Sequence, residues 1–173
     1  MFVANHNSWM DIPFLGATIG WRNYKFVAKK ELEKVPILSS AIEVAGNLMV
    51  DRKDKRSGLK TLRTGIDYMK DGVHLCTFPE GTRSRDGRVM KFKNGAFKMA
   101  HKAGAAVIPL SIVGAQHVQP PNWMFPRMPS HKNSKVVVHR PVESKGLSEE
   151  ELAEKVREAM IEGLPDDQKP KKK

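Results

Sequence analysis

Apolar positions follow two patterns along the chain: short continuous runs, and longer stretches in which apolar residues recur at helical spacing. This alternation predicts an α/β fold. The clearest predicted helix ends at Asp71-Gly72 and carries an apolar stripe made of Leu59, Leu62, Ile66 and Met69. A second helix is expected over "NGAFKMAHKAG", closed by Gly104. A third should begin at the capping-box pair Ser148 and Glu151 and turn three apolar residues inward, namely Leu152, Val156 and Met160.

The apolar runs between these helices predict the strands of a sheet. They lie at Phe2–Ala4, Tyr24–Ala28, Asn47–Val50, Val73–Phe78, Ala106–Val113 and Lys135–His139. Pro109 marks an edge strand or a bulge, because proline has no N–H to donate to a ladder. Residues Lys30–Ala45 are expected to be helical with an interruption near Pro36, and Gln116–Ser134 is a Pro-rich connection longer than packing requires.

Length and composition indicate a single domain. The chain has 173 residues, enough for one domain and too few for two, and its 40% hydrophobic and 28% charged residues are typical of a folded protein. We expect a catalytic or binding domain over residues 1–164, followed by a basic disordered tail over residues 165–173 that ends in "KPKKK".

The chain is strongly basic, with 30 Lys and Arg residues against 19 acidic residues and a net charge of +11. Such a surface attracts polyanions, which include nucleic acid, anionic lipid and phosphorylated small molecules. Aromatic residues make up only 7% of the chain and form no visible stacking pattern. A nucleic-acid-binding module is therefore the less favoured interpretation.

The positions of the cysteine, the histidines and the apolar runs argue against an internal disulfide, a metal site and a membrane-spanning helix. Cys76 is the single cysteine, so no internal disulfide forms, and a buried structural thiol is favoured over a thioester nucleophile. The histidines show no metal-ligand spacing, so no metal is expected. No apolar run approaches the ~18 residues that a membrane-spanning helix needs, and "MFVAN" is not a secretory leader, so any membrane contact should be peripheral.

The motif "NHNSWMD" places His6 and Asp11 five residues apart. On a helix this spacing rotates the two side chains about 140° apart, and on a strand it sends them to opposite faces. Only a turn that becomes the first turn of a helix would join them, as a carboxylate that orients an imidazole base. A chain of this composition contains about 0.3 such pairs by chance. The alternative interpretation is therefore that His6 is a surface histidine with no relation to Asp11, and that Asp11 is an aspartate at the start of a helix.

A second motif, "FPEGTRS", follows a predicted strand. Pro79 fits a tight turn, Gly81 allows close approach of a ligand to the backbone, and Arg83 offers a planar fork to a phosphate or carboxylate. The run "NLMVDR" also ends in a cation, Arg52. Ligands of α/β proteins bind at strand ends, although a surface turn with a solvated arginine has the same appearance.

Taken in this order and spacing, "NHNSWMD", "NLMVDR", "FPEGTRS" and "VIPLSI" resemble the four motif blocks of the glycerolipid acyltransferases, in particular the 1-acyl-sn-glycerol-3-phosphate acyltransferases. The resemblance extends from Phe2 to Gly114 and is looser beyond. It implies a single α/β domain with a mixed, mostly parallel sheet flanked by helices, like that of glycerol-3-phosphate acyltransferase. Members of this family usually carry apolar helices before the histidine block, and almost nothing precedes it here.

The resemblance also implies a reaction and a set of roles. His6 is expected to be the general base that Asp11 orients, deprotonating the sn-2 hydroxyl of lysophosphatidic acid for attack on an acyl thioester. Residues expected to hold the glycerol phosphate are Arg52, Glu80, Gly81, Thr82 and Arg83, with Lys29 of "FVAKKEL" as a further phosphate ligand. Glu80 cannot bind phosphate itself and is expected to orient the acceptor or an arginine.

Several features of the reaction stay open at the sequence level. The acyl donor is acyl-CoA or acyl-acyl carrier protein, no other cofactor is implied, and glycerol 3-phosphate is the alternative acceptor because it carries the same phosphate. The family resemblance implies an enzyme associated with a membrane surface, on the cytoplasmic or the plastid-stromal side.

The segment "PPNWMFPRMP" at residues 120–129 contains apolar side chains, four prolines and no acidic residue. Its prolines exclude a helix or a central strand. Trp123 and Phe125 are expected either to fold back over the core or to contact a lipid surface together with Arg127 and Lys132.

Overall fold

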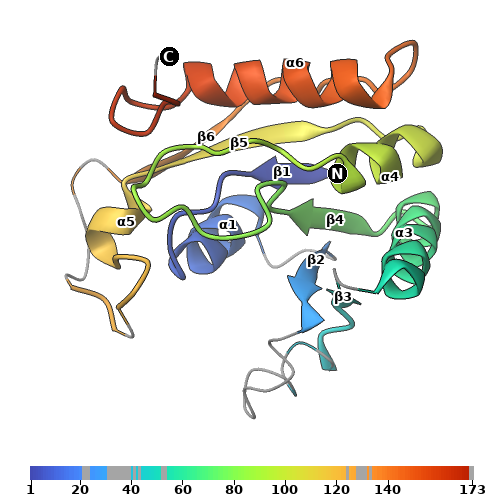
Figure 1. Ribbon diagram of the computed structural model, residues 1–173, viewed down its shortest axis with the longest axis horizontal. Coiled ribbons are helices and arrows are strands. Elements are labelled where there is room, and N and C mark those ends of the chain that lie inside the picture. Colours follow the sequence, from blue (N-terminus) through green and yellow to red (C-terminus); the bar gives the residue numbers. More distant parts are fainter. Residues whose placement is uncertain are drawn as a thin grey trace.

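The computed structural model describes residues 1–20, 24–30, 40, 42, 44–51, 54–123, 125–127, 132 and 134–171. One sheet of six strands runs through the molecule in the order β3-β2-β4-β1-β5-β6 (Figure 1). Neighbouring strands are parallel except for the antiparallel pair β5 and β6. The strands are β1 (Phe2–Ala4), β2 (Tyr24–Lys29), β3 (Leu48–Val50), β4 (His74–Thr77), β5 (Ile108–Val113) and β6 (Lys135–Val138). The predicted α/β fold with a mixed, mostly parallel sheet is confirmed.

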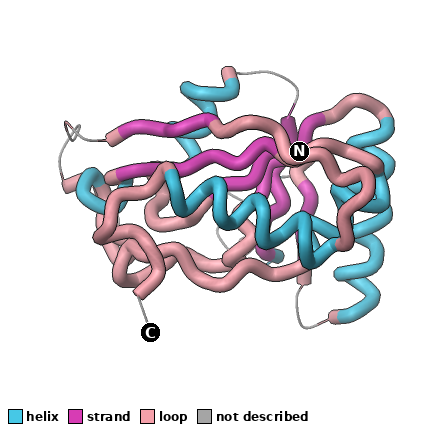
Figure 2. The backbone as a smooth tube through the Cα atoms, turned by 90° about the horizontal axis from the view of Figure 1, so that it is seen from above, coloured by secondary structure: helices cyan, strands magenta, loops and turns pink. Residues whose placement is uncertain are grey.

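Helices cover both faces of the sheet, as Figure 1 shows with α6 above it and α1 below it, and Figure 2 shows from above with α6 in front of the strands. The helices are α1 (Asp11–Ile19), α3 (Lys55–Lys70), α4 (Gly95–Ala103), the short α5 (Ala115–Val118) and α6 (Glu149–Glu162). The apolar residues of α3, α4 and α6 share one core cluster, and those of α1 belong to a second.

The central strands are apolar on both faces because each face is covered. In β1, Val3 belongs to the cluster under α6 and the next residue, Ala4, to the cluster on the α1 side. Leu75 and Cys76 alternate in the same way in β4. This alternation is what a strand with period two produces, and it explains why these strands appear in the sequence as continuous apolar runs.

The predicted helix caps form, whereas Leu59 of the predicted apolar stripe in α3 is 56% exposed. Helix α3 starts after Asp54, whose side chain accepts the N–H of Arg56, and Gly72 follows its end with a positive φ of 77°. Helix α4 ends at Gly104, which is left-handed with φ 64°. Helix α6 has the complete capping box, and its predicted inward residues are fully buried: Leu152, Val156 and Met160. The helix predicted over Lys30–Ala45 falls mostly outside the described residues.

Pro109 does not lie on an edge strand, because β5 has β1 on one side and β6 on the other. The ladder slips here instead: Leu110 pairs with Val138 while Val107 pairs with Val142, so the two residues between these pairs on one side face three on the other. Proline lacks the N–H that a regular pair would use, and this one-residue slip corresponds to the bulge interpretation.

The C-terminal segment packs against the domain beyond residue 164. Gln168 is 1% exposed, its Oε1 accepts the N–H of Gly114 at 2.9 Å, and its Nε2 donates to the carbonyl of Ile112 at 3.1 Å. Its own carbonyl accepts the N–H of Val89 at 2.9 Å. The folded unit therefore extends past the boundary that the sequence indicates, since one glutamine joins three separate segments.

Cys76 is fully buried, and this burial raises the pKa of its thiol to about 12, so the thiol is structural, as the sequence indicates.

None of the described helices combines the length and the apolar character required to cross a bilayer.

Candidate active site

The carboxyl ends of the parallel strands bring most of the predicted site residues to one edge of the sheet. The His6 segment follows β1, Lys29 ends β2, and the "PEGTR" segment follows β4. A cavity of about 210 Å³ lies there. It is lined by five of the eight predicted residues, His6, Lys29, Gly81, Thr82 and Arg83, together with apolar and aromatic side chains. Asp11 and Glu80 are buried behind it, and Arg52 lies outside the described residues.

His6 and Asp11 are in direct contact. The imidazole Nδ1 lies 2.7 Å from Asp11 Oδ2, and Asp11 is fully buried whereas the His6 side chain is 17% exposed. Asp11 is the first residue of α1 and β1 ends at Ala4, so the chain bends from strand to helix over the six residues between them and joins the two side chains. This is the turn that the spacing predicts.

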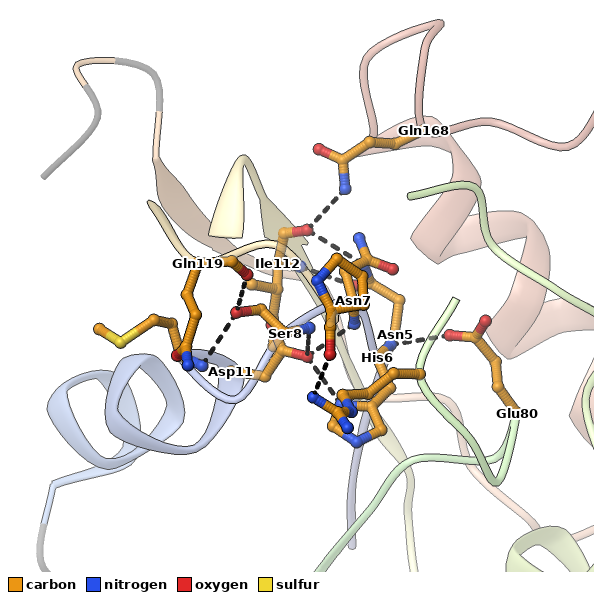
Figure 3. A network of polar contacts seen from close by, with 12 residues as sticks. Asn5, His6, Asn7, Ser8, Asp11, Glu80, Ile112, Gln119 and Gln168 are labelled. Carbon is orange, nitrogen blue, oxygen red and sulfur yellow. Dashed lines mark hydrogen bonds and ion pairs between the residues drawn. The ribbon is translucent and has the colours of Figure 1, made fainter. Parts of the chain in front are cut away.

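The same carboxylate oxygen also shapes the turn. Asp11 Oδ2 accepts the backbone N–H groups of Asn7 at 2.7 Å and Ser8 at 2.9 Å (Figure 3). An oxygen that already accepts two backbone N–H groups also acts as an acceptor toward its third partner. The proton in the His6 contact therefore belongs to Nδ1. This leaves Nε2 unprotonated in the neutral ring, which is the state that a general base needs.

The histidine ring and backbone are fixed from the β4 side. The ring stacks on Phe78 with centroids 4.0 Å apart and planes 14° apart. The backbone N–H of His6 donates to Glu80 Oε1 at 2.8 Å, and the His6 carbonyl accepts the N–H of Ser84 at 2.8 Å. The two motifs, far apart in sequence, therefore form one unit in which the second holds the first.

Glu80 is a positioning residue in this geometry. Its second oxygen, Oε2, accepts the N–H of Met90 at 2.8 Å, so both oxygens bind backbone amides rather than an arginine. The side chain is 3% exposed, and burial raises its pKa from the usual 4.5 to about 7, although the two amides favour the charged form. The sequence predicts that Glu80 orients the acceptor or an arginine. In the structure both of its carboxylate oxygens accept backbone N–H groups instead.

Arg83 is one of the residues that line the cavity. Its Nη1 donates to the carbonyl of Pro121 at 2.7 Å, and its guanidinium lies 4.6 Å from the centre of the Trp9 ring. Partial burial lowers its pKa, while Asp11 opposes this shift. An arginine stays charged throughout the neutral range. The cavity thus combines a cationic fork, the Lys29 ammonium and the free edge of His6.

A larger cavity of about 680 Å³ adjoins this site, and the two share Val27 and Phe78 as lining residues. Its walls come from β2, β3, β4, α3 and α4 and include Val50, Leu62, Ala96 and Met99. Acidic and basic side chains lie on it as well, among them Asp54 and Lys93. Its mostly apolar lining and its size, within the ~300–1,000 Å³ of ligand pockets, suit a long apolar ligand.

Several supporting residues were not identified from the sequence. Asn5 accepts the N–H and binds the carbonyl of Ile112 in β5, at 2.7 and 3.0 Å, which continues the β1–β5 pairing past the end of the strand (Figure 3). Ser8 Oγ donates to the carbonyl of Gln119 at 2.7 Å. Asn5 and Ser8 lie inside the motif "NHNSWMD", so their position in the motif indicates a role in the site. Gln119 belongs to no motif, so the sequence around it does not indicate its contact with Ser8.

The described residues contain no group of three His, Cys, Asp or Glu side chains that could hold a metal ion.

The raised pKa of Glu80 predicts a pH-dependent stability. The folded state retains a proton on Glu80 between about pH 4.5 and 7 that the unfolded chain has lost, so the free energy of unfolding falls as pH rises through this window. Relative to a Glu80→Gln variant, which cannot titrate, we expect a fall of about 3 kcal/mol. Urea unfolding of both proteins at several pH values measures it, and a difference that stays flat with pH would contradict the account.

Three comparisons place this geometry among known proteins. Residues 1–113 match the family described as "Acyltransferase". The chain is 33% identical over 164 residues to the 1-acyl-sn-glycerol-3-phosphate acyltransferase LPAT1 of Arabidopsis thaliana, covering 95% of this chain and 44% of the relative. It is 35% identical over 119 residues to a probable enzyme of the same name from Mycoplasma pneumoniae, covering 66% of this chain and 44% of that one.

A solved structure agrees. The crystal structure of the 1-acyl-sn-glycerophosphate acyltransferase PlsC from Thermotoga maritima superposes with a TM-score of 0.73 at 36% identity, over 94% of this chain and 63% of that chain. The chain spans less than half the length of these two sequence relatives. On the family match and these similarities, the chain belongs to the acyltransferase family.

Proposed function

We propose that this chain is the catalytic domain of an enzyme that transfers a fatty acyl group from an acyl thioester to the sn-2 hydroxyl of lysophosphatidic acid, giving phosphatidic acid. The observation that carries the proposal is the His6–Asp11 contact of 2.7 Å beside a cavity that also holds Arg83 and Lys29. An oriented base next to two cations suits a substrate that has both a hydroxyl and a phosphate. The activity for which the relatives are named supports the same reaction.

The reaction proceeds in two steps around His6. As the substrate hydroxyl oxygen bonds to the thioester carbonyl carbon, Nε2 takes the hydroxyl proton and the carbonyl electron pair moves to oxygen. The tetrahedral intermediate then collapses, the C–S bond breaks, and Nε2 returns the proton to the leaving thiolate. Asp11 keeps the Nδ1 proton in place and stabilises the imidazolium between the steps. The donor is a thioester of coenzyme A or of acyl carrier protein, and no other cofactor takes part.

The two cavities divide the substrates. Arg83 and Lys29 bind the acceptor phosphate in the smaller cavity, with Arg52 as a further proposed ligand. The apolar chain of the donor lies in the larger cavity, whose shared walls Val27 and Phe78 bring it up to the His6 ring. Gly81 and Thr82 allow the acceptor to approach the backbone after β4.

An acceptor panel tests this function. The purified protein with labelled acyl-CoA, and separately with acyl-acyl carrier protein, should acylate lysophosphatidic acid more efficiently than glycerol 3-phosphate or uncharged lysolipids. A preference for glycerol 3-phosphate would identify the alternative acceptor. Salt-sensitive nucleic-acid binding without acyl transfer would refute an acyltransferase.

Removing the base should stop the chemistry without unfolding the protein. We expect His6→Ala to lower kcat about 10²–10⁴-fold, the usual contribution of a general base, and Asp11→Asn to be similarly severe because the Nδ1 proton loses its acceptor. Matched exposed controls, His101→Ala and Asp67→Asn, should retain activity. Normal turnover by His6→Ala would refute the mechanism.

The Arg83 guanidinium should matter mainly for the acceptor. Replacing it in Arg83→Lys keeps the charge but loses the planar fork, so we expect the acceptor KM to rise about tenfold and the donor KM to change little. The exposed neighbour variant Arg85→Lys serves as the control. Equal changes in both KM values would show that Arg83 is structural instead.

Filling the larger cavity should shorten the acyl chains accepted. Gly58 lines this cavity from helix α3, and a Cβ added there meets no atom within 4 Å. We expect Gly58→Leu to lower kcat/KM for long-chain donors at least tenfold relative to short-chain donors, without loss of stability because Leu is a better helix former than Gly. Lys60→Leu adds the same side chain to α3 away from this cavity, and an equal effect there would contradict the assignment.

A further inference from the structure

The connection after α5 exposes two large aromatic side chains. Trp123 is 52% exposed and Phe125 is 73% exposed, so neither covers the core, and of the two alternatives that the sequence leaves open the core-covering one does not hold for them. Most large apolar side chains of the described residues are buried, and an exposed pair so close in sequence is a candidate contact surface.

Hydrogen bonds hold the loop that presents them in a defined shape. The N–H of Arg127 donates to the carbonyl of Val118 at 2.7 Å, which closes the loop at its base. The N–H of Trp123 donates to the carbonyl of Pro120 at 3.0 Å, and Gln119 Nε2 donates to the carbonyl of Trp123 at 3.0 Å. The two aromatic side chains therefore point outward from a closed loop rather than from a loose end.

The same loop adjoins the active site. Ser8 Oγ donates to the carbonyl of Gln119, and Arg83 Nη1 donates to the carbonyl of Pro121, both at 2.7 Å. Ile12, a further exposed apolar side chain at 38%, lines the cavity of His6 and Arg83. A surface that contacts this loop therefore lies beside the cavity that His6 and Arg83 line.

Charge and backbone chemistry indicate what that surface is. Residues 116–135 contain no Asp or Glu, and they include the cations Arg127, Lys132 and Lys135. Prolines at positions 120, 121, 126 and 129 lack an N–H, and the N–H groups of Trp123 and Arg127 are already bonded, so few amides would be desolvated on entering an apolar phase. Aromatic rings beside basic residues are the pattern of a protein anchored at headgroup depth in an anionic bilayer.

We propose that residues 119–123 and 125–127 form a membrane-contact site, with Trp123 and Phe125 inserted at the headgroup level of an anionic bilayer and Arg127 and Lys132 facing its lipid phosphates. This surface sets the cavity of His6 and Arg83 against the membrane. The placement of the cavity against the membrane rests on the proposed function, because it assumes a lipid acceptor that enters from the bilayer. The contact between the loop and the membrane does not depend on the proposed function.

Vesicle co-sedimentation tests the contact in the absence of any donor or acceptor. The whole protein is mixed with vesicles of phosphatidylcholine alone or with about one third phosphatidylglycerol. We expect it to bind the anionic vesicles, and Trp123→Ala/Phe125→Ala to reduce the partition coefficient about tenfold or more. The control Val44→Ala/Val138→Ala removes two apolar side chains that are 89% and 57% exposed elsewhere, and should bind like the parent protein.

A charge variant and a milder variant complete the test. Arg127→Glu/Lys132→Glu should reduce binding to anionic vesicles and leave binding to phosphatidylcholine unchanged. If the double alanine variant fails to fold by circular dichroism, Phe125→Ser alone decides, because this side chain is 73% exposed. Unchanged vesicle binding by a folded aromatic variant, or binding lost equally in the Val44/Val138 control, would overturn the proposal whether or not the protein transfers acyl groups.

Discussion

The site depends on one buried carboxylate oxygen. Asp11 Oδ2 accepts hydrogen bonds from His6 Nδ1–H and from the backbone N–H groups of Asn7 and Ser8, so a single atom fixes the turn, the start of α1 and the tautomer of the histidine. Full burial of Asp11 strengthens these contacts, because no water competes for the carboxylate. The tautomer of His6 is therefore a consequence of how the chain enters its first helix.

The rest of the fold keeps that turn in place. Parallel pairing of β1 with β4 and β5 delivers its carboxyl end beside two other strand ends. From β4 come the Phe78 ring against the imidazole and the Glu80 carboxylate on the His6 amide, and from β5 come the Ile112 backbone groups that Asn5 binds. Burial of the Glu80 carboxylate, which raises its pKa, opposes folding at neutral pH. The hydrogen bonds that Glu80 accepts from the N–H groups of His6 and Met90 hold the His6 segment rigid.

Much of this arrangement is predictable because it is local. Strand and helix positions follow from apolar runs, the Ser148 cap and the Gly104 stop, and the His6–Asp11 bend follows from a spacing that no regular element satisfies. The parts that were not predicted depend on distant segments. Glu80 binds amides of residues 74 positions before and 10 positions after it, and Gln168 reaches β5 from a segment whose composition indicates a tail.

Histidine NMR tests the central claim, that Asp11 sets the protonation of His6. In ¹⁵N-histidine-labelled protein, with His6 assigned by a His6→Gln variant, the neutral ring should carry its proton on Nδ1 and show an unprotonated Nε2, and the Nδ1 proton should resonate far downfield. In Asp11→Asn this downfield resonance should be lost. A neutral His6 that carries its proton on Nε2 in the parent protein would contradict the account, because that nitrogen could not accept a proton from a substrate hydroxyl.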